Sequence, residues 1–220
     1  MDLFEAKNNL KKRVVTSLAL LLLLYISFIN NYILGYILII VGIFSLLEFF
    51  KITKIIFHKK IIFKVIFNSI FFLYVFIFCS LILVQSNYLF TKIIIFILIL
   101  TCSASDIGGY IFGKVFKGAK LTKISPNKTI SGSVGSLVLS NITFLTLVYL
   151  LSNNISFKLA IIGLLISISA QVGDLFFSYL KRKSQIKDTG EFLPGHGGVL
   201  DRIDGILFGV PVGLITLGLL

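Results

Sequence analysis

The stretch IIFKVIFNSIFFLYVFIFCSLILV, residues 61–84, decides the class of fold. It runs for 24 residues and contains one charged side chain, Lys64. About 20 apolar residues in a helix cross the roughly 30 Å of hydrocarbon in a bilayer. A strand of a membrane barrel would instead alternate apolar and polar residues. This stretch therefore predicts a membrane-spanning helix.

Six further apolar runs extend this prediction to an all-α integral membrane protein with about seven transmembrane helices. The seven runs cover residues 14–30, 32–50, 61–84, 92–113, 132–152, 157–180 and 203–220. The first follows basic residues, as a signal peptide does, but no small-residue cleavage site follows it. We therefore expect it to be a retained anchor. The composition agrees, because 57% of the 220 residues are hydrophobic and only 14% are charged, against about 25% in soluble domains.

The distribution of basic residues predicts the orientation. Nineteen of the 21 Lys and Arg residues fall at the N-terminus or in alternate loops on one side, and only Lys92 and Lys158 fall on the other. The basic side of a membrane protein is normally cytoplasmic, so we expect a cytoplasmic N-terminus. Membrane topology also explains the net charge of +12 without nucleic acid as a partner. Cys79 and Cys102 lie inside apolar runs, which predicts buried, unpaired thiols.

The apolar runs in the two halves of the chain differ in composition. Residues 1–100 are predicted to be transmembrane scaffold helices, and their apolar runs contain one carboxylate, Glu48. Residues 101–220 carry Gly, Ser, Asn, Gln and Asp within their apolar runs. We interpret this half as a catalytic region with cytoplasmic loops at 114–131 and 181–202.

Four carboxylates in the second half are the strongest functional signal. Carboxylates inside a bilayer are costly unless they are paired, bound to metal or exposed to water. The four lie near the cytoplasmic ends of predicted spans: Asp106, Asp174, Asp201 and Asp204. Solvation at the interface could explain any one of them, but it is a weaker explanation for all four on one side.

Spacing places these carboxylates on polar helix faces. Gln171, Asp174, Ser178 and Lys181 follow one another at intervals of three or four residues, which predicts one polar stripe on a helix. Asp106 shares a face with Gly109 and Gly113, where small residues allow another helix or a ligand to come close. Asp201 and Asp204 lie one turn apart. Carboxylates converging from several helices suit Mg²⁺, which prefers oxygen ligands and retains waters that substrate phosphates can replace.

The two cytoplasmic loops supply positive charge. Five lysines lie in 114–132, and several of them are explained by topology and attraction to anionic lipid. Arg182 and Arg202 lie beside the carboxylates in the sequence. The planar guanidinium group of arginine can donate two parallel hydrogen bonds to phosphate oxygens. His196 stands in Pro-Gly-His-Gly-Gly, where glycines let backbone N–H groups approach an anion. Together these features indicate phosphoryl or nucleotidyl transfer on a lipid phosphate.

The stretch SYLKRKSQIKDTGEFLPGHGGVLDRID, residues 178–204, resembles the signature of phosphatidate cytidylyltransferases, also called CDP-diacylglycerol synthases. The matching positions are Ser178, Lys181, Arg182, Lys187, Asp188, Pro194, His196, Gly197, Gly198, Asp201, Arg202 and Asp204. Gln171-Val-Gly-Asp174, the stretch Asp106 to Gly113, and Ser125-Pro-Asn-Lys-Thr129 resemble other motifs of the family. Many members carry Glu where this chain has Ser131. The resemblance covers residues 103–205, and the part before it is shorter than in many members.

The resemblance implies the reaction CTP + phosphatidate → CDP-diacylglycerol + pyrophosphate. It implies Mg²⁺ as cofactor, leaves K⁺ open as a second cation, and implies a homodimeric, multi-pass enzyme of the inner (cytoplasmic) membrane with its active site at the cytoplasmic face. Asp174 and Asp201 would bind the metal, with Asp204 as a further candidate. Catalytic roles then fall to Asp174, Ser178, Lys181, Arg182, Asp201 and Arg202, and substrate binding to Asp106, Lys128, Lys187, Asp188, His196, Gly197 and Gly198.

Three alternatives remain beside this interpretation. A CTP-dependent kinase acting on a polyprenol or diacylglycerol would use similar groups but release CDP. A CDP-alcohol phosphotransferase is disfavoured, because Asp201-Arg-Ile-Asp204-Gly is not followed by the rest of that family's pattern. A transporter would place carboxylates at the bilayer midplane in repeated halves, and no repeat is visible here.

Overall fold

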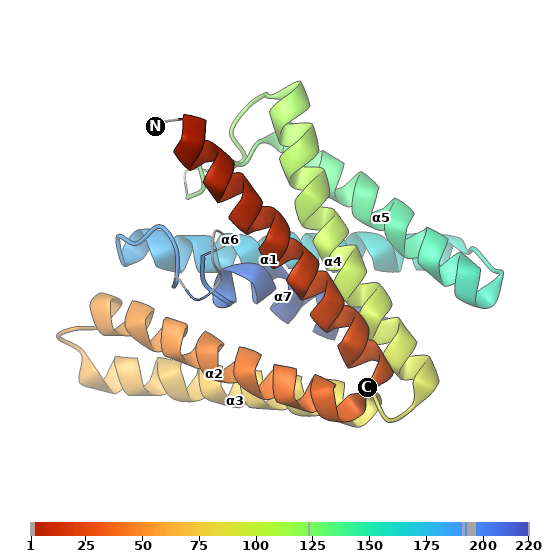
Figure 1. The fold of residues 1–220 in the computed structure, drawn as a ribbon, viewed down its shortest axis with the longest axis horizontal. Coiled ribbons are helices and arrows are strands. Elements are labelled where there is room, and N and C mark those ends of the chain that lie inside the picture. The colour runs from red at the N-terminus through yellow and green to blue at the C-terminus, as the bar shows by residue number, and fades with distance from the viewer. Residues whose placement is uncertain (1–2, 123, 191, 193–196, 220) are drawn as a thin grey trace. The chain divides into compact units, whose positions relative to one another are not determined.

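A computed structural model describes residues 3–122, 124–190, 192 and 197–219, with side chains from Val15 onward. These residues form seven α-helices (Figure 1). The helices are α1 (Leu3–Ile29), α2 (Asn31–Ile56), α3 (Ile61–Gln85), α4 (Leu89–Phe116), α5 (Ile130–Ser152), α6 (Phe157–Lys183) and α7 (Leu200–Thr216). Each apolar run predicted from the sequence coincides with one helix, so the all-helical prediction is confirmed.

Five of these helices, α2 to α6, are long and apolar enough to cross a membrane. The apolar part of α1, Val15–Ile29, and the whole of α7 have fewer than 18 residues. Large apolar side chains cover the outside of the helices, for example Ile43 on α2 and Phe72 on α3, which are both about half exposed. Such a surface suits lipid and not water, so the fold is consistent with a multi-pass membrane protein.

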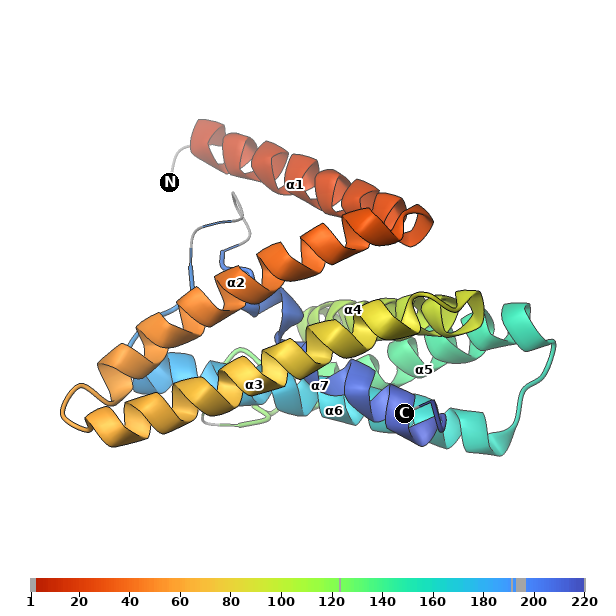
Figure 2. The same ribbon diagram turned by 90° about the horizontal axis from the view of Figure 1, so that it is seen from below.

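The described chain divides into two compact units. Unit 1 comprises Met1–Asn87 and Lys183–Arg202, and unit 2 comprises Tyr88–Arg182 and Ile203–Leu220. In unit 1, α2 and α3 lie side by side as an antiparallel pair, and α1 leaves the start of α2 at an angle (Figure 2). The side chain of Asn30 caps α2 by accepting hydrogen bonds from the backbone N–H groups of Tyr32 and Ile33.

Polar and aromatic contacts hold α2 against α3. The Thr53 hydroxyl lies 2.7 Å from the side-chain oxygen of Asn68, and the rings of Phe49 and Phe71 stack with centroids 3.9 Å apart. The thiol of Cys79 contacts the Leu38 carbonyl. Cys79 and Cys102 are both unpaired, with Cys102 buried and Cys79 partly buried, as their apolar surroundings predicted.

Glycines bring α4 and α5 together in unit 2. A Cβ on Gly108 would lie 2.5 Å from the carbonyl oxygen of Gly135, and a Cβ on Gly132 would lie 2.8 Å from that of Gly109. Two helix backbones can approach this closely only where side chains are absent. The predicted role of the glycines on this face of α4 is therefore confirmed, and the partner is α5.

Small residues also seat α7 against α6 and α4 within unit 2. A Cβ on Gly173 of α6 would lie 2.5 Å from the Asp204 carbonyl oxygen, and Gly209 of α7 faces the thiol of Cys102 on α4. Buried apolar side chains such as Leu207 and Val210 complete the interface. This packing places Asp204 of α7 against α6.

We predict that Gly108→Ala destabilises the protein by about 1–3 kcal/mol, because the added methyl group meets backbone atoms of α5 that have no room to move. Gly35→Ala is the matched control. Its methyl group would lie 3.5 Å from Leu83, an ordinary contact, so we expect it to be neutral or stabilising by up to about 1 kcal/mol through helix propensity. Thermal unfolding in detergent, followed by circular dichroism, measures both. Equal midpoints for the two variants would contradict the close approach of α4 and α5.

Candidate active site

Three helices of unit 2 each contribute a carboxylate to one neighbourhood. Asp106 lies on α4, Asp174 on α6 and Asp204 on α7. The charges of Asp106 and Asp174 act on the Asp204 carboxyl, and so does the ammonium group of Lys181. Asp204 is only 5% exposed, and its Oδ1 accepts a hydrogen bond of 2.8 Å from the backbone N–H of Gly205. The packing of unit 2 thus gathers three of the four predicted carboxylates.

Asp174 has two side-chain partners. Its Oδ2 forms an ion pair with the ammonium group of Lys128, and its Oδ1 accepts a hydrogen bond of 3.3 Å from the Ser178 hydroxyl, one turn further along α6. Asp174, Ser178, Lys181 and Gln171 are all partly buried, whereas Phe176 and Tyr179 on other faces are exposed. The predicted polar stripe is confirmed.

Lys128 lies in a short hairpin between α4 and α5, which places its side chain beside Asp174. The backbone N–H of Leu121 donates to the Lys128 carbonyl at 2.8 Å, and the Lys128 N–H donates to Ser125 at 3.0 Å. An isolated antiparallel bridge joins Lys120 and Thr129. The described residues of this loop, which is drawn in green where α4 and α5 join in Figure 1, therefore hold the Lys128 backbone by hydrogen bonds.

The start of α5 closes this hairpin. The Thr129 hydroxyl caps α5 by accepting from the Gly132 N–H at 3.1 Å. The Ser131 hydroxyl donates to the Lys117 carbonyl and lies 3.0 Å from the Thr129 hydroxyl. Lys117 has a positive φ of 50°, which is uncommon for residues other than glycine, and the Ser131 hydroxyl holds its carbonyl.

Hydrogen bonds between helices fix the interior end of the polar stripe. The Ser133 hydroxyl on α5 donates to the Gln171 side chain on α6. The hydroxyls of Ser105 on α4 and Ser167 on α6 lie 3.0 Å apart, and Ser136 donates to the Ser105 carbonyl at 2.7 Å. In an apolar surrounding, each of these groups would be costly without a partner. The network therefore sets how α6 is oriented toward α4 and α5.

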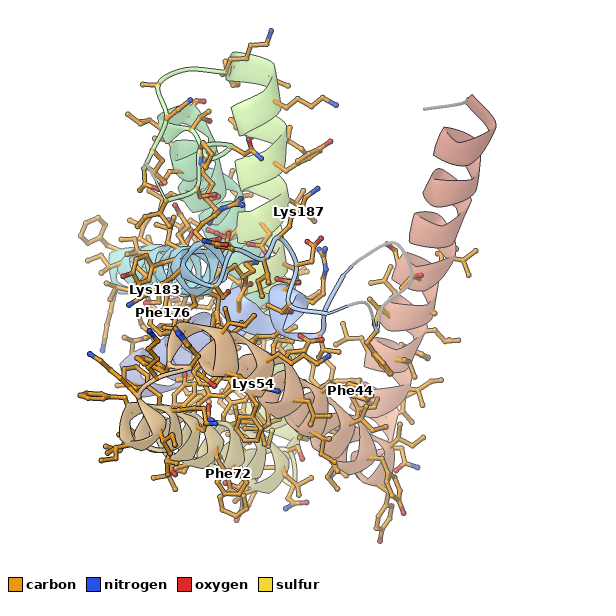
Figure 3. All side chains as sticks on the ribbon, turned by 90° about the vertical axis from the view of Figure 1, so that its left-hand side faces the viewer. Phe44, Lys54, Phe72, Phe176, Lys183 and Lys187 are labelled. Atoms are coloured by element: carbon orange, nitrogen blue, oxygen red, sulfur yellow. The ribbon has the colours of Figure 1, made fainter. Side chains whose placement is uncertain are left out.

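Unit 1 contains the rest of the predicted signature, which we call the signature segment, residues 183–202. It runs from Lys183 past Lys187, both labelled in Figure 3, to the first turn of α7. Within it, Asp201 Oδ2 accepts hydrogen bonds from the backbone N–H of Thr189 at 2.8 Å and from that of Gly198 at 3.2 Å. This carboxylate therefore joins Thr189 to Gly198 within the segment.

A second carboxylate, Glu48 of α2, anchors the same segment. Glu48 is 3% exposed. Its Oε1 accepts from the Val199 N–H at 3.0 Å, and its Oε2 accepts from the Leu200 N–H at 2.8 Å and from the Thr189 hydroxyl at 2.6 Å. The Glu48 carboxylate thus satisfies N–H groups at the start of α7, where a negative charge is also favoured by the helix dipole.

The glycines of the segment are required by this close packing. A Cβ on Gly198 would overlap the Thr189 hydroxyl and lie 2.5 Å from Glu48 Oε2, and a Cβ on Gly190 would overlap Glu48 Oε1. Gly197 has φ of +83°, a conformation that favours glycine. The described N–H of Gly198 therefore serves the protein's own carboxylate, Asp201, where the sequence had suggested an external anion.

The other predicted residues are more open. Arg182, Lys187, Asp188 and Arg202 are exposed, which suits groups that meet a substrate. His196 and Pro194 lie outside the described residues. The ring of Phe192 packs at a tilt against that of Phe44 on α2, with centroids 3.7 Å apart, and Phe44 is labelled in Figure 3.

Two residues of this arrangement were not predicted to act in the site, Glu48 and Thr189. Glu48 was visible as the one carboxylate in the apolar runs of the first hundred residues. A buried acid in such a run needs partners, and that signal could have pointed to it. Thr189 directly follows a matched Lys-Asp pair of the signature.

The donor chemistry of the site fits a hard divalent cation. Among the described residues, no group of three or more His, Cys, Asp or Glu side chains forms a ready metal cluster. Mg²⁺ does not need one, since it commonly uses one or two protein carboxylates and takes its other ligands from water and substrate phosphates. Asp174 already attracts a cation, the Lys128 ammonium.

The comparison with protein families agrees with this chemistry. Residues 2–220 match the model of the cytidylyltransferase family, and the chain belongs to that family.

Several curated relatives are named phosphatidate cytidylyltransferase. The chain is 44% identical over 110 residues to one from Staphylococcus saprophyticus, a match that covers 49% of this chain and 42% of the relative. It is 42% identical over 122 residues to one from Helicobacter pylori, a match that covers 54% of this chain and 45% of the relative. One from Staphylococcus aureus is 43% identical over 110 residues, a match that covers 49% of this chain and 42% of the relative. The matched stretch thus spans less than half the length of each relative.

We predict that Lys128→Met changes the free energy of unfolding by no more than about 1 kcal/mol, because an ion pair with solvent access contributes little to stability. The side chains of Lys128 and Asp174 are 27% and 28% exposed. Lys120→Met, at an exposed lysine of the same hairpin, is the matched control for loss of a positive charge. Thermal unfolding of both variants in detergent tests this. A much larger loss for Lys128→Met alone would mean that the pair is structural.

Proposed function

We propose that this protein catalyses CTP + phosphatidate → CDP-diacylglycerol + pyrophosphate. The observation that carries the proposal is the gathering of Asp106, Asp174 and Asp204 with Lys128 and Lys181 in unit 2, in a chain of the cytidylyltransferase family. The names of the curated relatives support the choice of phosphatidate as the acceptor. Carboxylates beside lysines suit a reaction in which phosphates are positioned and their charge is offset.

In the proposed reaction, a phosphate oxygen of phosphatidate attacks the α-phosphorus of CTP. A new oxygen–phosphorus bond forms, the bond from the α-phosphorus to the oxygen of the β-phosphate breaks, and pyrophosphate leaves. A phosphate monoester has a second pKa of about 6, so phosphatidate is largely dianionic at neutral pH. The reaction therefore requires no strong base from the protein.

The residue roles in this proposal rest on the resemblance of the signature and on the charge of each side chain. Lys181, Arg182 and Arg202 offset the charge of the leaving pyrophosphate, and Ser178 donates to a phosphate oxygen. Lys128 and His196 contact the nucleotide. Asp106, Lys187, Asp188 and Gly197 are the further substrate-binding residues in this proposal, whereas the N–H of Gly198 serves Asp201. The exposure of Arg182 and Arg202 supports their role, because guanidinium groups that bind phosphate must be reachable.

Mg²⁺ is the cofactor in this proposal, held by Asp174 and Asp201 with Asp204 as a further candidate ligand. When bound, it would neutralise phosphate charge and orient the reacting groups. The resemblance of the signature and the oxygen donors support this assignment. The protein's own part is to present these oxygens, through the Ser178 contact at Asp174 and the Thr189 and Gly198 contacts at Asp201. K⁺ is a second cation to test.

The membrane arrangement is also proposed. Seven spans, with α1 and α7 added to the five long apolar helices, put the N-terminus in the cytoplasm by the distribution of basic residues. The active site then opens to the cytoplasmic face of the inner membrane, where CTP is available. Residues 1–100 act mainly as scaffold and residues 101–220 carry the catalytic groups, with loops 114–131 and 181–202 on the cytoplasmic side. A homodimer is the proposed assembly.

We predict that the purified protein, given labelled CTP and phosphatidate with Mg²⁺, releases pyrophosphate and forms a labelled liponucleotide in equal amounts. Removing Mg²⁺ with a chelator should stop both products, and adding Mg²⁺ back should restore them. The control replaces phosphatidate by diacylglycerol. Release of CDP with phosphorylation of that lipid would instead identify a CTP-dependent lipid kinase.

We predict that Asp174→Ala abolishes turnover while the protein still inserts into the membrane and unfolds at a similar temperature. The carboxylate is partly exposed, so its loss affects charge in the site more than packing. Asn154→Ala, an exposed position in the loop between α5 and α6, controls for handling and yield. Activity of Asp174→Ala close to that of the unaltered protein would refute its role as a metal ligand.

A further inference from the structure

Glu48 lies far from the signature segment in the sequence, yet it supports that segment at three points. Its carboxylate accepts hydrogen bonds from the Thr189 hydroxyl and from the backbone N–H groups of Val199 and Leu200. These partners are separated from it by at least 141 residues. One buried side chain of α2 therefore contacts the segment that carries Asp201 both at Thr189 and at the start of α7.

Thr189 connects the two carboxylates. Its hydroxyl lies 2.6 Å from Glu48 Oε2 and 3.0 Å from Asp201 Oδ2, and its backbone N–H donates to the same Asp201 oxygen at 2.8 Å. A hydroxyl has one hydrogen to donate. The shorter contact assigns that hydrogen to Glu48, while the N–H of Thr189 and that of Gly198 serve Asp201. Thr189 is thereby held from one side by Glu48 and itself orients Asp201.

We propose that Glu48 is a positioning residue, which fixes the orientation of the Asp201 carboxylate through Thr189 and through the first turn of α7. The inference rests on the proposed function, in which Asp201 binds the cation. Glu48 itself is buried and occupied by the segment, so it acts through Thr189 and Asp201 and not on the substrate. It follows that an apolar scaffold helix contributes to the geometry of the active site.

The first test is Glu48→Gln, which keeps the shape of the side chain but replaces one acceptor oxygen by an NH₂ group. That group cannot accept from a backbone N–H, so at least one anchor of the segment is lost. We expect kcat for CDP-diacylglycerol formation to fall by about 10–100-fold, the range found when a group that orients a metal ligand is removed. KM for CTP should change much less, because Lys128, the proposed nucleotide contact among the described residues, pairs with Asp174.

The second test uses Thr189. Thr189→Val keeps the volume of the side chain and removes the hydroxyl, whereas Thr189→Ser keeps the hydroxyl. We expect the valine variant to lose kcat as Glu48→Gln does and the serine variant to retain most of it. Ser45→Ala is the matched control for a buried polar group of α2, because the Ser45 hydroxyl donates to the Val41 carbonyl of its own helix. Its kcat should be that of the unaltered protein.

Hydrogen–deuterium exchange of the full-length protein in detergent gives a readout that does not depend on activity. In Glu48→Gln, the amides of peptides covering residues 184–202 should exchange faster than in the unaltered protein, while those of α3 should not change. Ser45→Ala should leave both regions unchanged. This pattern, together with the rescue by serine at position 189, would support the proposal.

Two results would overturn it. Unchanged exchange of residues 184–202 in Glu48→Gln would show that Glu48 does not anchor the segment. Faster exchange with an unchanged kcat would show that the anchor does not position Asp201 for the reaction. If the unaltered protein forms no CDP-diacylglycerol at all, the proposed function fails, and with it the catalytic role of Glu48, while the exchange measurement still decides whether the anchor exists.

Discussion

The cost of leaving a polar group unpaired in an apolar surrounding is the constraint on which this structure depends. Helices satisfy the backbone, but the side chains of Ser, Gln, Asp and Glu within them need partners of their own. In unit 2 the serines and Gln171 pair between α4, α5 and α6. In unit 1 the buried Glu48 is paired with Thr189 and with N–H groups at the start of α7. These bonds are directional, so they specify orientation where apolar packing alone would allow sliding.

Glycine makes room for these polar groups to meet their partners in two ways. At Gly108 and Gly132 the missing side chain lets two helix backbones meet, which brings the serines of α4 and α5 within hydrogen-bonding distance. At Gly190 and Gly198 it makes room for the Glu48 carboxylate and the Thr189 hydroxyl. The same residue type thus shapes the helix interface of one unit and the loop of the other. In both places an added methyl group would meet backbone or hydrogen-bonded atoms that cannot move cheaply.

Much of the fold and part of the candidate site could be predicted from the sequence. Apolar runs of about 20 residues have few alternatives to helices, and intervals of three and four residues identify the face of a helix. For these reasons the helices and the stripe from Gln171 to Lys181 were predicted correctly. Lys128 was predicted as a site residue, but its ion pair with Asp174 was not, because the hairpin that delivers it has no periodicity to reveal which helix it reaches. The roles of Glu48 and Thr189 were missed for a similar reason, since their partners lie far away in the chain.

By itself, the sequence determined the helical class, the helix positions, the residues with chemistry to offer and a resemblance to one enzyme family. These are local properties, set by composition, by helical period and by short motifs. Only the tertiary structure decided which oxygen meets which hydrogen: that Lys128 pairs with Asp174, that Ser131 holds the loop at Lys117, and that Glu48 anchors the segment carrying Asp201. Those contacts join residues up to 152 positions apart. They depend on how helices and loops pack in three dimensions, which no single stretch of sequence encodes.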